Sequence, residues 1–296
     1  MARVLLVGCG DIGSGLATVL VAQGHQVSAV KRTAPQRALP GVSYLICDIT
    51  QPDQVQRIPC EVDQVFVILA PGERTENHYQ ALFIVGLSNL LHHFANSPEA
   101  RSTLQGATPH WPHWIFVSST SVYGQHGGEW VDEKSPTLPQ GFNGRCLLQA
   151  EKLLHEHDAS ATVVRFSGIY GPDRSGLVQS VLQGKPVQYL PSYYTNRIHA
   201  EDCVHLLAHL LAQRLAGAVL EACYVASDNT PASLREVVTW LAQQLGCAVP
   251  PATAATAHSR GQNKRCCNKQ IIGLGYQFRH SDYRSGYRDI INAYSG

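Results

Sequence analysis

A glycine-rich turn near the start of the chain constrains the fold more than any other feature. The motif G-x-G-x-x-G, with glycines at Gly8, Gly10 and Gly13, follows directly on an apolar run and opens a stretch with helical spacing. The first glycine permits a tight turn, the second lets the backbone approach a pyrophosphate, and the third lets helix and strand pack closely. Free amides at the start of the helix, at Asp11 and Ile12, favour an anion there. The motif predicts a strand, a turn and a helix that bind a dinucleotide.

Apolar runs alternate with stretches of helical spacing over much of the chain. The apolar runs lack a polar face, which is typical of parallel strands covered on both sides. The predicted strands span residues 3–7, 27–30, 44–46, 65–69, 115–117, 162–166 and 219–225, and the predicted helices span 12–23, 76–94, 145–157, 200–215 and 234–245. This alternation predicts an α/β fold with a doubly wound parallel sheet.

The composition of the chain changes after residue 170, where prolines and a cluster of tyrosines appear. We expect residues 1–170, with 199–226 returning to the sheet, to form a dinucleotide-binding domain. We expect residues 171–198 and 227–296 to form a smaller, interleaved C-terminal lobe that binds the substrate.

Two cations stand where NAD-binding folds usually carry an acid. Lys31 and Arg32 follow the second predicted strand, roughly twenty residues after the glycine loop. An arginine can pair with a 2′-phosphate through two parallel hydrogen bonds. We therefore predict NADP(H) in preference to NAD(H), although a solvated Lys-Arg pair is the alternative. Asp48, after the third strand, is placed either to contact the adenine or to cap the following turn.

Charge and hydropathy exclude two classes of partner. With 23 basic and 22 acidic residues the formal net charge is +1, and no long basic block occurs. Nucleic acid is therefore not an expected partner. No run approaches the ~18 apolar residues that a membrane-spanning helix needs, so no membrane partner is expected either.

Cysteine and histidine usage bears on redox state and metals. The nine cysteines are an odd number without a Cys-x-x-Cys pair, which predicts buried reduced thiols and a cytoplasmic protein. The pairs His110/His113 and His155/His157 have no third ligand nearby in the sequence, so we expect no metal site.

Several motifs in order resemble the short-chain dehydrogenase/reductase superfamily, on the side of the extended NAD-dependent epimerase/dehydratases. Besides the glycine loop they are Cys47-Asp48-Ile49-Thr50, Val117-Ser118-Ser119-Thr120-Ser121-Val122-Tyr123-Gly124, Arg165-Phe166-Ser167-Gly168-Ile169-Tyr170-Gly171-Pro172 and Asn196-Arg197-Ile198-His199-Ala200-Glu201-Asp202. The C-terminal Asn263-Lys264-Arg265 is similar to a tail of atypical members, the YeeZ-like bacterial proteins among them. The resemblance implies a Rossmann sheet and a cytoplasmic nicotinamide-dependent enzyme.

The resemblance also implies contacts beyond the glycine loop. Further cofactor-binding residues are expected at Asp48, Ile49, Leu69, Ala70, Pro71, Ser167 and Ile169. Four residues border the expected substrate side: Arg165, Tyr170, Arg197 and His199. They either bind an anionic group of the substrate or tie the C-terminal lobe to the sheet.

The catalytic pair of the family is missing. Active members carry Tyr-x-x-x-Lys on the helix after the Ser-rich strand, where the lysine lowers the pKa of the tyrosine. Counted from Glu151, these positions hold Asn143 and Leu147. Ser119 matches the hydroxyl donor of the family, and Tyr123 is a weak base without a nearby lysine. The remaining catalytic candidates are therefore Ser119, Tyr123 and Asn143, with packing as the alternative role for Tyr123.

Three functions remain open from the sequence. The first is an NADP(H)-dependent oxidoreductase or epimerase that acts on a small or nucleotide-linked hydroxyl or carbonyl compound. The second is a dinucleotide-binding sensor or regulator without hydride chemistry. The third is a non-redox lyase or isomerase on the same fold. A small-molecule substrate and a monomer or homodimer are expected.

Overall fold

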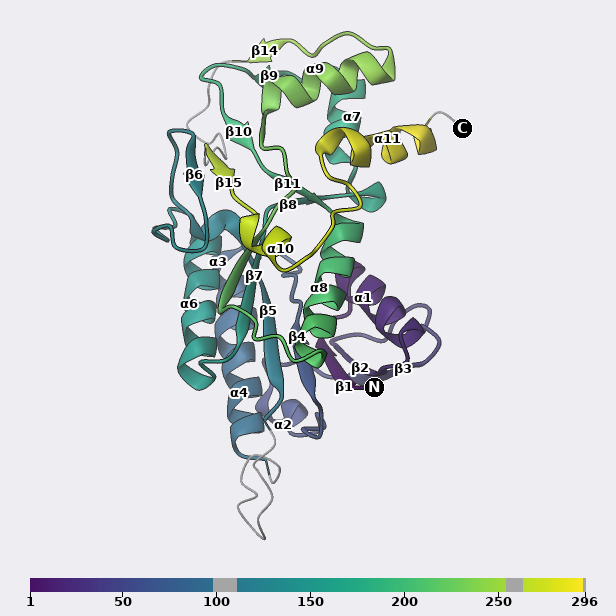
Figure 1. Cartoon of the computed structure of the whole chain (residues 1–296), viewed down its shortest axis with the longest axis vertical. Helices are drawn as coiled ribbons and strands as arrows, with labels where there is room; N and C mark the ends of the chain where they lie inside the picture. The colour runs from purple at the N-terminus through teal and green to yellow at the C-terminus, as the bar shows by residue number, and fades with distance from the viewer. Residues whose placement is uncertain (98–110, 254–262, 295–296) are drawn as a thin grey trace. The chain divides into compact units, whose positions relative to one another are not determined.

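The computed structural model describes residues 1–97, 111–253 and 263–294 (Figure 1). It divides the chain into two compact units, each built from separate segments. The first unit comprises residues 1–119, 139–164 and 204–223, and the second comprises residues 120–138, 165–203 and 224–296.

A seven-stranded sheet lies mainly in the first unit. Its strands are β1 (Arg3–Val7), β2 (Gln26–Lys31), β3 (Val42–Ile46), β4 (Gln64–Val67), β5 (His113–Ser119), β7 (Thr162–Phe166) and β12 (Cys223–Ala226). Their order is β12-β7-β5-β4-β1-β2-β3, and β1 pairs in parallel with both β2 and β4. The winding direction reverses between β1 and β4, which is where open α/β sheets bind their ligands.

Helices cover both faces of this sheet. They are α1 (Asp11–Ala22), α2 (Pro52–Val55), α3 (Glu76–Tyr79), the π-helix η1 (Gln80–Gly86), α4 (Leu87–Ala95), α6 (Phe142–His157) and α8 (Ala200–Leu215). In Figure 1, α4 and α6 lie beside each other on one side of the strands, and α1 lies with α8 on the other. Ile12, Leu16 and Leu20 recur at helical spacing in α1 and are buried, which is why this segment forms an amphipathic helix.

The second unit is built from short pieces. Its paired strands are β6 (Glu129–Val131) with β15 (Lys264–Cys266), β8 (Gly168–Tyr170) with β11 (Arg197–His199), β9 (Val187–Gln188) with β14 (Ala252–Thr253), and β10 (Tyr194–Thr195) with β13 (Ala232–Ser233). Its helices are η3 (Thr120–Val122), η4 (Pro172–Arg174), α7 (Gly176–Leu182), α9 (Leu234–Leu245), α10 (Lys269–Gly273) and α11 (Tyr283–Tyr294). An apolar core joins α7, α9 and α11 and includes Val178, Val238, Tyr283 and Ile290.

Asp202 ties the C-terminal segment of the second unit to the start of α8. Its side chain is fully buried. Oδ1 accepts hydrogen bonds from the Tyr276 hydroxyl and the Arg279 amide, both at 2.8 Å, and Oδ2 accepts one from the His280 amide at 3.0 Å. A carboxylate satisfied by several donors positions the backbone that supplies them.

The predicted fold class is confirmed, and most predicted elements are present. The predicted strand at 219–225 is wrong at its start, since β12 begins at Cys223 and Val219 is 93% exposed. Because Val219 is exposed, no burial of its side chain favours an earlier start of the strand. The sequence did not predict α2, α7, α10, α11 or the short strands of the second unit.

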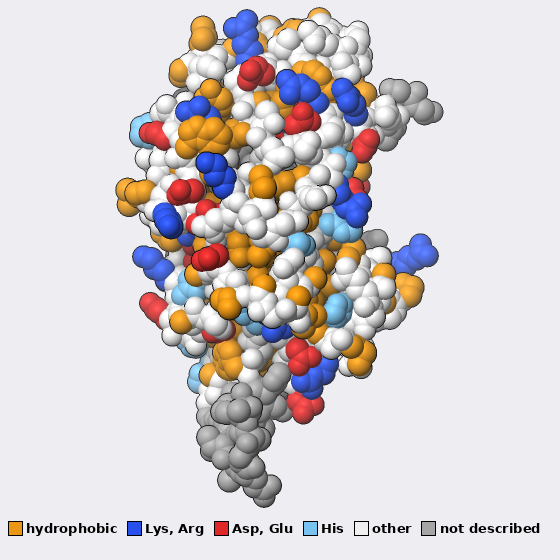
Figure 2. Space-filling view, viewed as in Figure 1, with side chains coloured by type: hydrophobic (Ala, Val, Ile, Leu, Met, Phe, Trp, Pro, Cys, Tyr) orange, Lys and Arg blue, Asp and Glu red, His pale blue; other side chains and the backbone are white. Residues whose placement is uncertain are grey.

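The surface agrees with the balanced composition. On the face shown in Figure 2, Lys and Arg side chains are interspersed with Asp and Glu. Among the described residues, no helix combines the length and the apolar character needed to cross a bilayer. The nine cysteines are free thiols, and most are buried.

We expect Asp202→Asn to lower the free energy of unfolding by about 2 kcal/mol, because an amide nitrogen would replace an oxygen that faces buried donors. Urea denaturation followed by circular dichroism measures this change. Asp173→Asn, at an exposed position of η4, is the matched control. Equal stability of the two variants would contradict the anchoring role of Asp202.

Candidate functional site

The turn between β1 and α1 is forced by close backbone contacts. Gly8 has φ +98°, and a Cβ there would lie 2.1 Å from the carbonyl oxygen of Ile68. A Cβ on Gly13 would lie 2.3 Å from the carbonyl oxygen of Gly8. Only glycine fits either position, because a side chain would collide with backbone atoms.

Gly10, by contrast, faces open space. A Cβ built on it meets no atom within 4 Å. Gly10 is the N-cap of α1, and the helix has no side-chain cap. The first helical bond runs from the Ser14 amide to the Gly10 carbonyl at 2.8 Å, so the amides of Ile12 and Gly13 precede the ladder. This open helix N-terminus has the donors and the space for a pyrophosphate.

Arg32 reaches across the end of β1. It is exposed and follows Lys31, the last residue of β2. Its Nη2 atom lies 3.6 Å from the Cβ position of Gly72, in the loop after β4. Because β1 lies between β2 and β4 in the sheet, the guanidinium extends past the end of β1, from which the glycine turn follows.

Asp48 caps a turn. Its Oδ1 accepts hydrogen bonds from the Thr50 amide at 3.0 Å and the Thr50 hydroxyl at 2.8 Å. Ile49 is buried, and its Cδ1 lies 2.7 Å from the Cβ position of Gly86 in η1. The residues predicted to follow β4 lie on the same edge, with Ala70 exposed and Leu69 and Pro71 half-buried.

The two serines that end β5 have different surroundings. Ser118 is buried, and its hydroxyl donates to Glu151 Oε1 on α6 at 2.5 Å. Ser119 is half-buried at the carboxyl end of the strand. Successive side chains of a strand point to opposite faces, so Ser119 points away from Glu151.

Helix α6 carries no phenol or amine at the family positions. Asn143, in its first turn, is half-buried, and Leu147 is 6% exposed. Sequence reasoning missed Tyr79 on α3, whose ring packs edge-on against Phe142 at 5.4 Å between centroids. Tyr79 thus places a phenol beside the start of α6, a contact that only the packing of α3 on α6 reveals.

In the second unit, Tyr123 and Arg165 form a buried pair. Tyr123 is 0% exposed, and its hydroxyl accepts a hydrogen bond from Arg165 Nη1 at 2.8 Å. The guanidinium also lies 5.1 Å from the centroid of the tyrosine ring. These contacts favour the packing role of Tyr123 and hold Arg165 inside the unit.

Tyr170 and His199 lie together. Their ring centroids are 5.2 Å apart, and β8 and β11 place them opposite each other in register. Burial raises the pKa of the Tyr170 hydroxyl well above its ordinary value. Burial, together with the neighbouring His280, lowers the pKa of His199. Both rings are therefore neutral near physiological pH.

Arg197 is buried and bound within the unit, since its Nη2 donates to Thr195 Oγ1 at 2.6 Å. Ser167 is also buried, and its hydroxyl has no hydrogen-bond partner among the described residues. An unpartnered hydroxyl fits the predicted cofactor contact at this position. Ile169 follows in β8, half-buried.

Two further buried charges were missed from the sequence. Burial lowers the pKa of Lys264 to about 8, and its Nζ donates to the Tyr123 carbonyl at 3.3 Å. Burial raises the pKa of Asp228 to about 7, and its Oδ2 has no partner among the described residues. Lys264 belongs to the C-terminal motif Asn263-Lys264-Arg265, but the shifted pKa values of Lys264 and Asp228 cannot be read from the sequence, because desolvation depends on the folded surroundings.

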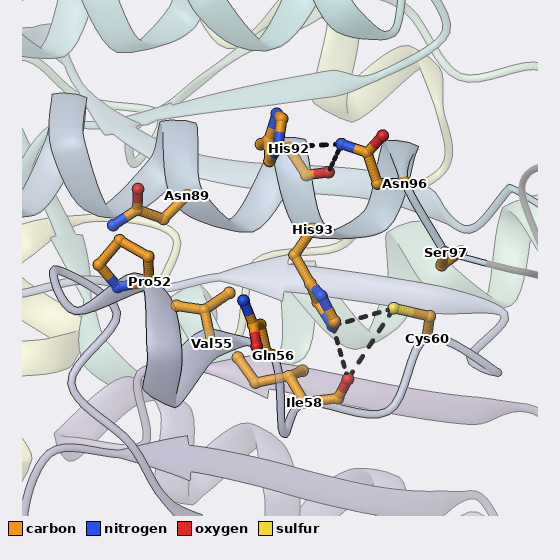
Figure 3. A pocket seen from close by; sticks show the side chains of 10 residues that line it. All are labelled: Pro52, Val55, Gln56, Ile58, Cys60, Asn89, His92, His93, Asn96 and Ser97. Atoms are coloured by element: carbon orange, nitrogen blue, oxygen red, sulfur yellow. Dashed lines mark hydrogen bonds between the residues drawn. The ribbon is translucent and has the colours of Figure 1, made fainter.

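A pocket of about 630 Å³ lies between α2 and α4, and no residue of the glycine turn lines it (Figure 3). It is lined by Pro52, Val55, Gln56, Ile58, Cys60, Asn89, His92, His93, Asn96 and Ser97. His93 Nε2 lies 2.8 Å from the Ile58 carbonyl oxygen and 3.2 Å from Cys60 Sγ. A carbonyl only accepts, so Nε2 carries the proton and cannot deprotonate the thiol. The pocket therefore holds no activated nucleophile.

Comparison with known proteins agrees with the motifs. Residues 4–223 match a family model described as the NAD dependent epimerase/dehydratase family. The protein YeeZ of Escherichia coli (strain K12) is 28% identical over 303 residues, which cover 95% of this chain and 97% of YeeZ.

Solved structures are similar over the whole chain. One from Methylobacillus flagellatus, described as an NAD-dependent epimerase/dehydratase, is 35% identical with a TM-score of 0.81 and covers 100% of this chain and 99% of its own. The UDP-glucuronic acid 4-epimerase of Bacillus cereus, in complex with UDP-glucuronic acid and NAD, is 18% identical with a TM-score of 0.79 and covers 99% of each chain. The resemblance inferred from the motifs is confirmed.

We expect Gly10→Ala to abolish dinucleotide binding while lowering the free energy of unfolding by less than about 1 kcal/mol. The new methyl group would occupy the space of the pyrophosphate without touching the protein. Calorimetric titration with NADPH and thermal unfolding measure the two effects. Gly273→Ala, also in open space, should bind normally, and Gly13→Ala should cost about 1–3 kcal/mol in stability. Normal NADPH binding by the Gly10 variant would contradict this placement.

We expect the stability of the protein to fall from about pH 4 to about pH 7 through Asp228. Over this range the folded state keeps a proton that the unfolded state has lost, so folding weakens by up to about 1.4 kcal/mol per pH unit. Asp228→Asn stays neutral and should remove this part of the slope in urea unfolding. The exposed Asp53→Asn is the control. Parallel curves for wild type and Asp228→Asn would contradict the assignment.

Proposed function

Because the chain belongs to the NAD-dependent epimerase/dehydratase family, we propose that it is an NADP(H)-dependent oxidoreductase or epimerase. The first unit would bind the dinucleotide, and the second would supply the substrate-binding residues. The substrate class is a small or nucleotide-linked hydroxyl or carbonyl compound. The similar epimerase of Bacillus cereus binds a nucleotide-linked sugar and NAD, which supports this substrate class. The preference for NADP(H) rests on this chain's own residues.

The open N-terminus of α1 beside Arg32 carries this proposal. Amides of the first turn would hold the pyrophosphate, with Gly10 giving its backbone room to approach. Arg32, and Lys31 beside it, would pair with the 2′-phosphate through charge-assisted hydrogen bonds. A carboxylate at this position would repel the phosphate, which is why the pair favours NADP(H).

The chemistry divides between the cofactor and the chain. When bound, the dinucleotide supplies or accepts a hydride. Ser119 would donate a hydrogen bond to the reacting oxygen, and Asn143 would orient the same group from the start of α6. With no Tyr-x-x-x-Lys pair, the proton of the hydroxyl would pass to or from water. A missing acid/base costs typically 10²–10⁴-fold in rate, so slow turnover is expected.

A second function is favoured by α6 itself. Leu147 is buried where the family has its lysine, and Asn143 replaces the tyrosine. A protein that binds the dinucleotide without turning it over would serve as a sensor of its redox state. Such a sensor must bind NADP⁺ and NADPH with different affinity, because equal affinity shifts no equilibrium. Titration with both forms, alongside an assay of NADPH oxidation with a panel of carbonyl compounds, separates the two functions.

We expect Arg32→Glu to weaken NADPH binding by about 10–100-fold, because it loses charge-assisted hydrogen bonds and adds repulsion. NADH binding should hold or improve. Side-by-side calorimetric titrations measure both constants. Lys152→Glu makes the same charge change on the exposed face of α6 and should leave both unchanged. If Arg32→Glu weakens NADPH and NADH equally, the 2′-phosphate is read elsewhere.

We expect Ser119→Ala to lower kcat roughly 10–100-fold while NADPH binding stays the same, since a hydroxyl that holds the reacting oxygen acts mainly in the transition state. The assay follows NADPH oxidation with whichever carbonyl compound the wild type reduces. Ser43→Ala, at an exposed position of β3, is the control. An unchanged kcat in Ser119→Ala would remove this serine from the mechanism.

A further inference from the structure

Two histidines and a glutamate converge within the second unit. His199 ends β11, Glu201 lies in the first turn of α8, and His280 precedes α11. One ring nitrogen of each histidine and a carboxylate oxygen of Glu201 all lie within 4.8 Å of one another. The centroids of the two imidazole rings are only 3.8 Å apart.

The histidines are buried and incompletely satisfied. His199 is 5% exposed, and its Nε2 has no hydrogen-bond partner among the described residues. Its Nδ1 meets only a long contact of 3.3 Å from the Glu201 amide. A buried ring nitrogen without a good partner needs an explanation, and a bound ion supplies one.

The surrounding residues hold His280 in place. The Asp202 carboxylate accepts the His280 amide at 3.0 Å, which fixes the backbone beneath the ring. His280 Nε2 lies 3.1 Å from Glu201 Oε2, and Nδ1, on the other side of the ring, lies 3.9 Å from Asp289 Oδ2. A metal-binding histidine usually donates its second ring N–H to a carboxylate, and Asp289 lies near this nitrogen but beyond hydrogen-bond distance.

We propose that His199, Glu201 and His280 bind a divalent transition-metal ion, with Zn²⁺ the ion of best fit. Two imidazoles and one carboxylate are a known zinc ligand set that leaves a position for water. Ligand atoms around a tetrahedral zinc ion lie roughly 3.4 Å apart. The cluster therefore needs to contract by up to about 1.4 Å at its widest, which the partly exposed side chain of Glu201 permits.

Arg279 opposes the ion. Its Nη1 pairs with Glu201 Oε1 at 3.0 Å, so the guanidinium occupies one oxygen of the carboxylate and repels a cation. Arg279 is about half exposed and its removal should not disturb the core. A metal site thus predicts that losing this arginine tightens binding, whereas a network of ion pairs alone predicts no metal affinity at all.

Spacing in the sequence could not reveal this cluster. Glu201 and His280 are 79 residues apart in the chain. Of the histidines considered from sequence, His110 lies outside the described residues, and the others hydrogen-bond elsewhere: His113 to Thr162 Oγ1, His155 to the Ala161 carbonyl and His157 to the Leu153 carbonyl.

The test is calorimetric titration of the full-length protein with zinc chloride after treatment with a chelator. We expect one zinc ion per chain in the wild type. Glu201→Gln and His280→Gln should each weaken binding at least 10-fold, and Arg279→Ala should tighten it several-fold. His157→Gln, an exposed histidine on α6, should match the wild type. Substitution with cobalt should give the visible absorption of four-coordinate Co²⁺, and Glu201→Gln should lose it.

Circular dichroism and thermal unfolding without metal show whether each variant is folded. If His280→Gln fails to fold, Glu201→Gln and Arg279→Ala still test the site, because both positions are partly exposed. Two results would overturn the proposal. One is a wild-type protein that binds zinc more weakly than a single exposed histidine does, and the other is equal zinc affinity in the wild type and Glu201→Gln. Because the titration contains no dinucleotide, its outcome is independent of NADP(H) binding.

Discussion

The approach of one backbone to another at the end of β1 is the contact on which the proposed dinucleotide site depends. Gly8 passes so close to the Ile68 carbonyl, and Gly13 so close to Gly8, that no side chain fits at either place. Helix α1 is thereby brought against the sheet, and its first amides lie at the carboxyl end of β1. Arg32, which follows β2, and the loop after β4 can then face the same space, because the sheet order places the two strands on either side of β1.

In the proposed function, binding and catalysis would rest on different parts of the first unit. The glycine turn and Arg32 belong to the carboxyl ends of β1 and β2, whereas proton transfer in the family belongs to α6. Here α6 keeps its structural contact, with Glu151 accepting from Ser118 inside the core. Helix α6 has Asn143 and Leu147 in place of the tyrosine and lysine of the family. Leu147 is buried, and a lysine ammonium at this position would need water or a hydrogen-bond partner. A leucine at this position is therefore compatible with the fold, and under the proposed function it would alter only the chemistry of the site.

Local sequence patterns predicted the elements that are both long and buried. The strand at residues 3–7 and the helices at 200–215 and 234–245 are present with the predicted bounds. The strand is a continuous apolar run that ends at a glycine, and the helix at 234–245 begins at a capping box and ends at a glycine. The exposure of Val219 and the π-helical geometry of η1 were not predicted. The spacing of apolar residues along the sequence indicates neither feature. The candidate site was predictable only where one segment supplies it, as in the glycine turn. Other features depend on segments that are far apart in the chain. They are the burial of Tyr123, the raised pKa of Asp228 and the contact between the rings of His199 and His280.

The division of the chain into segments has a consequence for synthesis on the ribosome. The chain passes from one unit to the other after Ser119, Leu138, Val164, Cys203 and Cys223. The glycine turn emerges first, yet the last segment of its own unit, at residues 204–223, appears only after most of the chain has been made. Neither unit can therefore complete its core as an early, independent domain. A circularly permuted chain that keeps all the segments of both units should fold better than either unit expressed alone.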